Sequence, residues 1–429
     1  MCALKQQNID LGVLSEVIDE SILIRTLNDL FTIIRSQLRE RDMDQNNFVL
    51  FNSVEGETRR LLTYVAYALP LFILGCGLNR SSGPVPSNPT TTATQHILFV
   101  GDSFTHGRYL PVRTYNNTPD TGGIGSTVAS AQVVDENFTT TVKARKETQP
   151  GETGPWGGIP GIFAQLAQEA GLPYDVHIEA ISATPLIENY NVAQDVIDRP
   201  LWNAVVLQEA SFQPIPVVLS QNSKSDPAVF CNAVGTIERG IHNVAENANV
   251  YLYQSWAPAD TAYSDSYTSS FSPSAYLTSL GQLSAAYHDV YLDAAAQDGH
   301  IAGIAPVGDA WSRAWNEGVA NPDPYGGSAT GVSLSFNYQP GSEPATIDKP
   351  TDAGYHHPSI YGAYLSGLVL FQKITGSDVR IFGATEQAAA TLGISPAVST
   401  QLQWVAWEAV TQQSNQLVKP DVDLCSLTH

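Results

Sequence analysis

The stretch His96-Ile-Leu-Phe-Val-Gly-Asp-Ser-Phe-Thr-His-Gly107 joins a short apolar run to a polar turn. Residues 96–101 are mostly large and apolar and end in glycine, a pattern that predicts a buried β-strand. Because Gly101 permits a tight turn, the hydroxyl of Ser103 is able to face a cleft just beyond the strand. Taken alone, Gly-Asp-Ser is a weak signal, since such tripeptides are frequent in ordinary turns.

Strand-like and helix-like stretches alternate downstream of this segment. The pattern predicts further strands at 174–181, 204–208, 250–254 and 290–293, and helices at 159–171, 228–245 and 275–287. Such alternation predicts a parallel sheet with helices on both faces, in which ligands bind beyond the carboxyl ends of the strands. Three long connections are predicted either to overhang that edge or to be plain surface insertions: 108–155, 256–274 and 318–350.

A second polar segment lies far downstream and leads into a predicted helix: Thr351-Asp-Ala-Gly-Tyr-His-His-Pro-Ser-Ile-Tyr-Gly362. A histidine followed by proline, with an aspartate a few residues earlier, is able to form an Asp–His pair within one turn. In such a pair the aspartate orients the imidazole and the histidine takes the proton of a serine nucleophile. The nucleophile elbow Gly-x-Ser-x-Gly of α/β-hydrolases is absent from the chain.

Together these two segments resemble the SGNH (GDSL-type) hydrolase family, and its exported bacterial members in particular. The resemblance covers residues 96–375. Its motifs are Gly101-Asp102-Ser103, Asp352…His357-Pro358-Ser359…Gly362, Gly157-Gly-Ile-Pro160, Leu207-Gln-Glu209 and Pro306-Val-Gly-Asp-Ala310. It implies an α/β fold: a three-layer, flavodoxin-like α/β/α sandwich with a mostly five-stranded parallel sheet. It also implies ester hydrolysis by a Ser–His–Asp arrangement, without metal or cofactor.

The resemblance implies roles for particular residues. Ser103 is the expected nucleophile, and its backbone amide is expected to contribute to the oxyanion hole. The glycine of the family's second block and the asparagine of its third are missing here. Gln208 carries the same NH2 donor on a longer side chain, so it is the expected oxyanion ligand; the alternative is an amide that bonds the strand edge. The amide of Ser182 or Ala183 is expected to replace the glycine.

The spacing of aspartate and histidine departs from the family pattern, which places the aspartate three residues before the histidine. That position is Gly354 here, and Asp352 lies five residues before His357. His357 is the expected base because the following Pro-Ser-x-x-Gly keeps the family's spacing from it, and His356 is the alternative. Asp352 completes the triad if two residues bulge out of the turn; otherwise Asp348 serves, or the site works as a dyad.

Other candidates carry weaker signals. Gln254 and Trp256 follow a predicted strand and are expected to bind substrate along the cleft wall, although Trp256 is equally consistent with a core position. His106 is interpreted as a turn residue. No metal ligands are predicted, because the acidic loop 318–350 lacks the spacing of an EF-hand.

The segment before residue 96 is typical of targeting. Arg59-Arg60 precedes the apolar run 61–74, which ends in Gly75-Cys76; this is the order of a signal peptide, and the run is short for a membrane span of about 20 residues. Its ending resembles a bacterial lipoprotein box, and 77–95 is a Ser/Thr/Pro-rich tether. We therefore expect a signal-like segment at 59–76, a lipid anchor at Cys76 in the cell envelope, and a hydrolase-like domain at 96–429. The alternative for 61–74 is a buried helix.

Residues 1–58 carry a helix-like pattern ahead of this signal. Either the true start codon lies further downstream, or a small cytoplasmic helix precedes an internal anchor.

The composition is that of a large acidic globular protein. The chain has 429 residues, of which 43% are hydrophobic, so it has enough apolar side chains to bury a core. Its 42 Asp and Glu against 21 Lys and Arg give a net charge of -21, which disfavours nucleic acid as a partner. Four cysteines exclude a disulfide scaffold and a Cys-rich zinc module. Cys231 and Cys425 either pair in an oxidising compartment or are two separate buried thiols.

The sequence therefore predicts a serine ester hydrolase acting on a small-molecule or polysaccharide ester. A carbohydrate O-acetyl ester or another short-chain ester is the expected substrate, by analogy. Lipid or thioester hydrolysis is the alternative within this class. A catalytically silent, surface-anchored carbohydrate-binding lipoprotein is the alternative from a different class.

Overall fold

A parallel β-sheet forms the centre of the computed structural model, which describes residues 93–117, 132–138, 154–266, 272–324, 332–336, 355–413, 420 and 423–427. Six strands are present in these residues: β1 (Gln95–Gly101), β2 (Val133–Asp135), β3 (Tyr174–Ala180), β4 (Ala204–Leu207), β5 (Asn249–Tyr253) and β6 (Gly303–Ala305). Their order across the sheet is β2-β3-β1-β4-β5-β6, so β1 lies near the centre. All six strands belong to one compact unit, residues 90–429.

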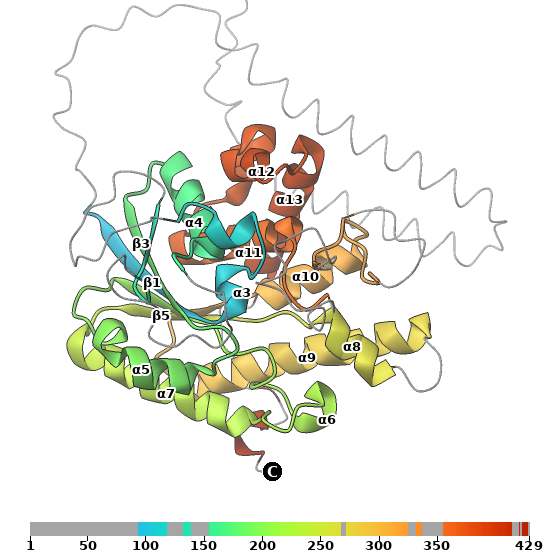
Figure 1. The fold of residues 1–429 in the computed structure, drawn as a ribbon, viewed down its shortest axis with the longest axis horizontal. Helices are drawn as coiled ribbons and strands as arrows, with labels where there is room; N and C mark the ends of the chain where they lie inside the picture. Colours follow the sequence, from blue (N-terminus) through green and yellow to red (C-terminus); the bar gives the residue numbers. More distant parts are fainter. Residues whose placement is uncertain are drawn as a thin grey trace, which may run out of the picture. The chain divides into compact units, whose positions relative to one another are not determined.

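Long helices cover both faces of the sheet (Figure 1). One face packs against α4 (Gly158–Glu169), α10 (Val307–Asn316) and α11 (Ile360–Thr375), with α13 (Pro396–Gln412) behind them. The other face packs against α5 (Leu186–Ile197), α7 (Pro227–Val244) and α9 (Pro273–Asp298). Shorter helices are α3 (Ser103–His106), η2 (Val112–Thr114), α6 (Val217–Ser220), α8 (Ala259–Ser266), η4 (Val379–Thr385), α12 (Gln387–Thr391) and η5 (Leu424–Ser426).

Alternate side chains of β1 enter opposite cores, as a buried central strand requires. Ile97 and Phe99 belong to the core under α4 and α11. Leu98 and Val100 belong to the core under α5 and α7. The predicted three-layer α/β/α sandwich is therefore confirmed, with one strand more than the five expected.

The predicted strands at 96–101, 174–181, 204–208 and 250–254 match β1, β3, β4 and β5 within one or two residues. The strand predicted at 290–293 is wrong, because these residues lie in the last third of α9. A short apolar run fits a buried helix as well as a strand, and here Val290 and Tyr291 are buried together with Tyr287 and Ala294 at helical spacing. The three-residue strands β2 and β6 were missed because they are too short to show a pattern.

The N-terminal predictions lie outside the described residues: the extension 1–58, the signal-like segment 59–76 with Cys76, and all but the last three residues of the tether 77–95. Among the helices that the structure describes, none is long and apolar enough to cross a membrane.

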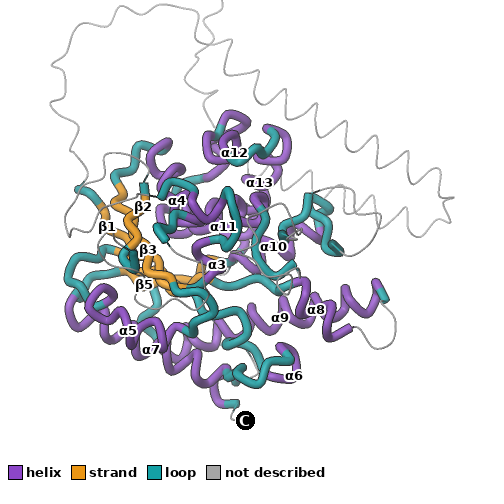
Figure 2. Tube along the Cα trace, viewed as in Figure 1, coloured by secondary structure: helices purple, strands orange, loops and turns teal. Residues whose placement is uncertain are grey.

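A disulfide joins Cys231 in α7 to Cys425 in η5, with the two Cα atoms 5.7 Å apart. The backbone N–H of Cys425 also donates to Oδ2 of Asp293 at 2.8 Å. Figure 2 shows the C-terminal segment ending next to α7. Of the two alternatives for these cysteines, the structure shows the pair.

Candidate active site

Ser103 and His357 meet at the carboxyl end of β1. Ser103 begins α3 directly after this strand, and His357 lies just before α11. Nε2 of His357 lies 2.8 Å from Oγ of Ser103. This distance is within the range over which a histidine takes a proton from a serine hydroxyl. The structure therefore joins two residues that the sequence separates by 254 positions.

The turn that carries Ser103 is fixed by its neighbours. A Cβ at Gly101 would lie 2.3 Å from Oγ1 of Thr105, so the close approach of the turn to the strand requires glycine. Asp102 caps α3 by accepting from the N–H of Phe104 at 2.9 Å. Asn189 of α5 donates its Nδ2 to the carbonyl of Gly101 at 3.0 Å. These contacts hold the serine at the strand end.

The segment that carries His357 pairs with residues 332–336. The N–H of Phe336 donates to the carbonyl of His357 at 2.8 Å, and the N–H of Ser359 donates to the carbonyl of Leu334 at 2.8 Å. Oγ of Ser359 then caps α11 by accepting from the N–H of Gly362 at 3.3 Å. The motif Pro-Ser-x-x-Gly after His357 is therefore a helix start, and it fixes where the histidine stands.

The imidazole of His357 is buried against aromatic rings. The rings of Phe104 and Tyr109 lie 5.7 Å and 5.5 Å from it, both edge-on. Burial lowers the pKa of His357 well below its usual value, and electrostatic interactions with His356 and Arg108 lower it further. The imidazole is therefore neutral at pH 7, as a general base requires.

The second ring nitrogen of His357, Nδ1, has no hydrogen-bond partner within the described part of the chain. Asp352 and its alternative Asp348, the predicted third members of the triad, lie outside the described residues and stay predictions. The described residues thus show a serine–histidine pair.

The pH dependence of activity should report on this buried imidazole. We expect kcat/KM to stay level as the pH falls through 6.5 and to decline only below it, because the neutral imidazole is the base and its pKa is lowered from 6.5. A kcat/KM profile for p-nitrophenyl acetate from pH 4 to pH 9, with circular dichroism at each pH as the folding control, measures this. Half-maximal activity at or above pH 6.5 would contradict it.

The turn after β3 lies across the cavity from the serine. Ala183 lines the same cavity as Ser103 and has a φ of 53°, a left-handed conformation that glycine adopts most easily. The backbone N–H groups of Ser103 and Ala183 make no hydrogen bond within the described residues. Both amides are therefore unengaged within the described residues, and their role in an oxyanion hole stays a prediction.

Gln208 does not face this cavity, so its predicted role as the oxyanion ligand is not supported. Its Oε1 accepts from the N–H of Asp102 at 2.9 Å and from the hydroxyl of Thr105 at 2.7 Å. Its Nε2 donates to the carbonyl of Glu209. The amide is thus engaged with the backbone and the nucleophile turn, which is the alternative that the sequence left open.

Gln254 and Trp256 do not line the cavity either, which corrects their predicted role in substrate binding. Trp256 is fully buried and stacks between Phe104 and Trp311, with ring centroids 4.1 Å and 4.3 Å away. Gln254 donates its Nε2 to Asp309 at 2.8 Å. The residue types alone do not distinguish a strand end that faces the cleft from one that faces the core.

His106 is the last residue of the short helix α3, so its interpretation as a turn residue is wrong by one position. Its Nε2 lies 2.8 Å from Oγ of Ser182, and its ring stacks on Trp156 with the centroids 4.3 Å apart. The backbone N–H of Arg108 donates to its Nδ1 at 3.3 Å. The side chain thereby connects the turn after β1 to the turn after β3.

The alternative base, His356, belongs to a second serine–histidine–aspartate contact beside the first. Its Nε2 lies 3.0 Å from Oγ of Ser211, and its Nδ1 lies 2.9 Å from Oδ1 of Asp260. Ser211 follows β4 and Asp260 follows β5 by a few residues. Sequence reasoning missed both. The one available signal was their position just after strands, and many other residues share that position.

Both serine–histidine contacts line one cavity of about 260 Å³. Its described lining combines polar side chains with apolar surface: Asp102, Ser103, Arg108, Ser182, Ala183, Ser211, Phe212, Ile215, Ser220, Asn222, Pro258, Thr261, Tyr287, His356 and His357. Fold and site together define an α/β/α protein with a buried serine–histidine pair at the carboxyl edge of its sheet.

No protein-family model and no curated protein sequence matches this chain. Solved structures similar to it include a GDSL-like lipase from Parabacteroides merdae, at 14% identity and a TM-score of 0.37, covering 66% of this chain and 95% of that one. Another is phospholipase A1 from Streptomyces albidoflavus, at 10% identity and a TM-score of 0.33, covering 65% and 98%. A third is a catalytic mutant of an acetylxylan esterase from Geobacillus stearothermophilus, at 11% identity and a TM-score of 0.32, covering 70% and 95%.

The likeness to these solved structures concerns the fold alone. The argument for function rests on the site.

Proposed function

We propose that this chain is a serine ester hydrolase of the SGNH type that removes short acyl groups, with O-acetylated carbohydrate as its substrate class. The observation that carries the proposal is the 2.8 Å contact between Oγ of Ser103 and Nε2 of His357 at the carboxyl edge of the sheet. Ligands of open parallel sheets bind at this edge.

In the proposed reaction, Nε2 of His357 takes the hydroxyl proton of Ser103 while Oγ attacks the ester carbonyl carbon. The backbone amides of Ser103 and Ala183 donate to the oxyanion that forms. His357 then returns the proton to the leaving alcohol, which leaves an acyl group on Oγ. Water, deprotonated by the same imidazole, hydrolyses this acyl-enzyme and restores the serine.

The cavity supports a short acyl group and a polar alcohol. Its volume of about 260 Å³ is below the range of about 300–1,000 Å³ typical of pockets for drug-sized ligands. Hydroxyl or amide side chains of Ser211, Asn222 and Thr261 and the buried cation of Arg108 contribute to the lining. Polar groups of this kind bind sugar hydroxyls, whereas a long lipid chain needs an apolar channel.

A series of p-nitrophenyl esters tests this proposal. We expect turnover of the acetate. We expect a kcat/KM for the octanoate that is at least about 10-fold lower, because the cavity is too small to bury the longer acyl chain. Release of acetate from acetylated xylan, measured beside the deacetylated polymer, tests the carbohydrate. A kcat/KM that rises with chain length would favour lipid hydrolysis instead.

A catalytically silent carbohydrate-binding protein is the second candidate. It is favoured by the imidazole of His357, whose Nδ1 has no carboxylate partner within the described residues. Ester hydrolysis at the background rate, together with binding of xylan or another polysaccharide, would support this candidate and overturn the first.

We propose further that the chain is exported and anchored through a lipid on Cys76. The disulfide between Cys231 and Cys425 supports an oxidising compartment. Release of a Cys76→Ala variant from the membrane fraction, with the parent chain retained there, is the expected result; equal fractionation of the two would contradict the anchor.

A further inference from the structure

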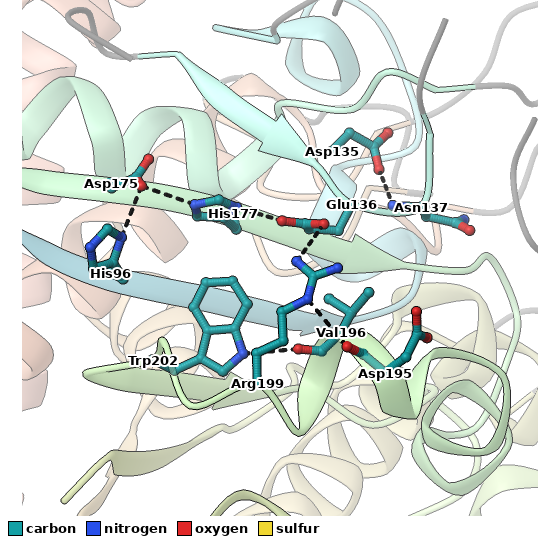
Figure 3. Close-up of polar contacts among 10 residues, drawn as sticks. All are labelled: His96, Asp135, Glu136, Asn137, Asp175, His177, Asp195, Val196, Arg199 and Trp202. Atoms are coloured by element: carbon teal, nitrogen blue, oxygen red, sulfur yellow. Dashed lines mark hydrogen bonds and ion pairs between the residues drawn. The ribbon is translucent and has the colours of Figure 1, made fainter. Parts of the chain in front are cut away.

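Two histidines and an aspartate meet at the edge of the sheet opposite Ser103. His96 stands near the start of β1, and Asp175 and His177 stand near the start of β3 (Figure 3). β1 and β3 are parallel, and His96 pairs with Asp175 in register, so all three side chains lie on one face. Five residues of strand, roughly 17 Å at about 3.3 Å per residue, separate His96 from Gly101 in the catalytic turn.

The donor atoms have the spacing of metal ligands. Oδ2 of Asp175 lies 2.9 Å from Nδ1 of His96 and 3.2 Å from Nε2 of His177. The ligand atoms of all three residues lie within 4.8 Å of one another. Tetrahedral Zn²⁺ with bonds of about 2.0–2.2 Å needs ligand atoms about 3.2–3.6 Å apart, and both contacts of Asp175 lie within a few tenths of an ångström of this spacing.

Two buried polar atoms of this cluster lack a hydrogen bond. Within the described part of the chain, Oδ1 of Asp175 has no hydrogen-bond partner, and Nε2 of His177 makes only the 3.2 Å ion-pair contact with Oδ2 of Asp175. The His177 side chain is 1% exposed and that of Asp175 is 5% exposed. Buried polar atoms in proteins are nearly always satisfied by a partner, and a bound cation would satisfy both of these.

A second carboxylate orients the buried imidazole. Nδ1 of His177 lies 2.8 Å from Oε1 of Glu136, and Oε2 of Glu136 lies 2.8 Å from the guanidinium of Arg199. When the Nδ1–H donates to Glu136, the lone pair of Nε2 points toward Asp175 and His96. Metal-binding histidines usually have such a carboxylate partner on the other ring nitrogen. Trp202 packs edge-on against the ring at 5.0 Å and encloses this side of the cluster.

The third ligand, His96, is partly exposed to solvent. The side chain of His96 is 23% exposed, whereas those of Asp175 and His177 are buried. A cation has a path from the surface past His96, and water is able to fill a fourth position. Two imidazoles with one carboxylate suit Zn²⁺ and similar transition metals, since Mg²⁺ and Ca²⁺ prefer oxygen ligands alone.

We propose that His96, Asp175 and His177 form a binding site for one divalent transition-metal cation that ties β1 to β3 at the edge of the sheet away from the active site. The cation has a structural role and takes no part in ester hydrolysis. The acidic loops show no metal-ligand spacing, so no metal ligands are predicted from the sequence. These ligands lie in two strands that are about 80 residues apart in the chain. The competing explanation is a metal-free ion-pair network, in which a protonated His177 stands between Asp175 and Glu136.

Calorimetric titration of Zn²⁺ into the full chain, after treatment with a chelator, tests the site. We expect one equivalent to bind, and Mg²⁺ to bind far more weakly. At a free Zn²⁺ concentration 100 times Kd, the ratio of folded to unfolded protein should rise about 100-fold, seen as a higher Tm. His96→Gln should abolish stoichiometric binding, and Glu136→Gln should weaken it about 10–100-fold.

His288→Gln is the matched control, because His288 also pairs with an aspartate, Asp309, at 2.9 Å, but lies outside the cluster. This variant should bind Zn²⁺ like the parent chain, and neither histidine variant should change kcat/KM for p-nitrophenyl acetate. Absence of stoichiometric binding by the parent chain would overturn the proposal in favour of the ion-pair network. Unchanged binding by both His96→Gln and His96→Ala would also overturn it, since the cation would then belong to other groups.

Discussion

Ser103→Ala is expected to lower kcat/KM for p-nitrophenyl acetate by about 10⁴–10⁶-fold, the range seen when a serine hydrolase loses its nucleophile. The reason is that Oγ of Ser103, which lies 2.8 Å from Nε2 of His357, is the atom that forms the acyl-enzyme, and alanine lacks it. Steady-state assays over several enzyme concentrations, with circular dichroism as the folding control, measure the loss. The side chain is small and stands at the cavity wall, so alanine should leave the fold intact.

Ser211→Ala is the matched control, because Ser211 also contacts a histidine, at 3.0 Å. In this variant kcat/KM should fall by less than about 10-fold, which corresponds to the loss of one hydrogen bond. The reverse outcome, a large loss with Ser211→Ala and a small one with Ser103→Ala, would move the nucleophile to the contact that Ser211 makes with His356 and Asp260.

His357→Gln is expected to lower kcat/KM by about 10⁴–10⁶-fold as well, because the glutamine amide cannot take the serine proton at neutral pH. The double variant Ser103→Ala/His357→Gln should be no slower than either single variant. When two residues act together in one step, removing either of them already removes the rate enhancement that both provide. The rate that remains comes from substrate binding and the oxyanion amides.

His356→Gln distinguishes the two neighbouring histidines, which the sequence alone left as alternatives. The parent His356 contacts Ser211 and Asp260, and its variant should retain activity within about 10-fold. If His356→Gln abolishes turnover while His357→Gln retains it, the base is His356 and the proposed mechanism is wrong.

The fold was largely predictable because its signals are local. β1 shows a run of apolar residues, β3 alternates apolar and polar residues, and the helix α4 shows its period and ends near Gly171. Burial of alternate faces and turn chemistry act over a few residues, so they leave a pattern that a single sequence shows. The strand prediction at 290–293 was wrong because a short apolar run fits the pattern of a buried strand and that of a buried helix equally well.

The candidate site was predictable in part. Ser103 and His357 were identified because each belongs to a motif whose glycines, proline and cap have local structural reasons. The side chains that support them were not identified. The side-chain amide of Gln208, for example, is oriented by hydrogen bonds from Asp102 and Thr105, which lie more than 100 residues away in the sequence.

The sequence by itself determined four of the six described strands, the turn that presents Ser103, and the helix start that places His357, because each depends on backbone preferences within a few residues. Only the tertiary structure decided that Trp256 is core, that Asp260 pairs with His356, and that His96 meets Asp175 and His177. Those relations depend on which strands become neighbours and in which register. The partners are separated by about 80 to 100 residues in the chain, so a pattern within a few residues does not identify them.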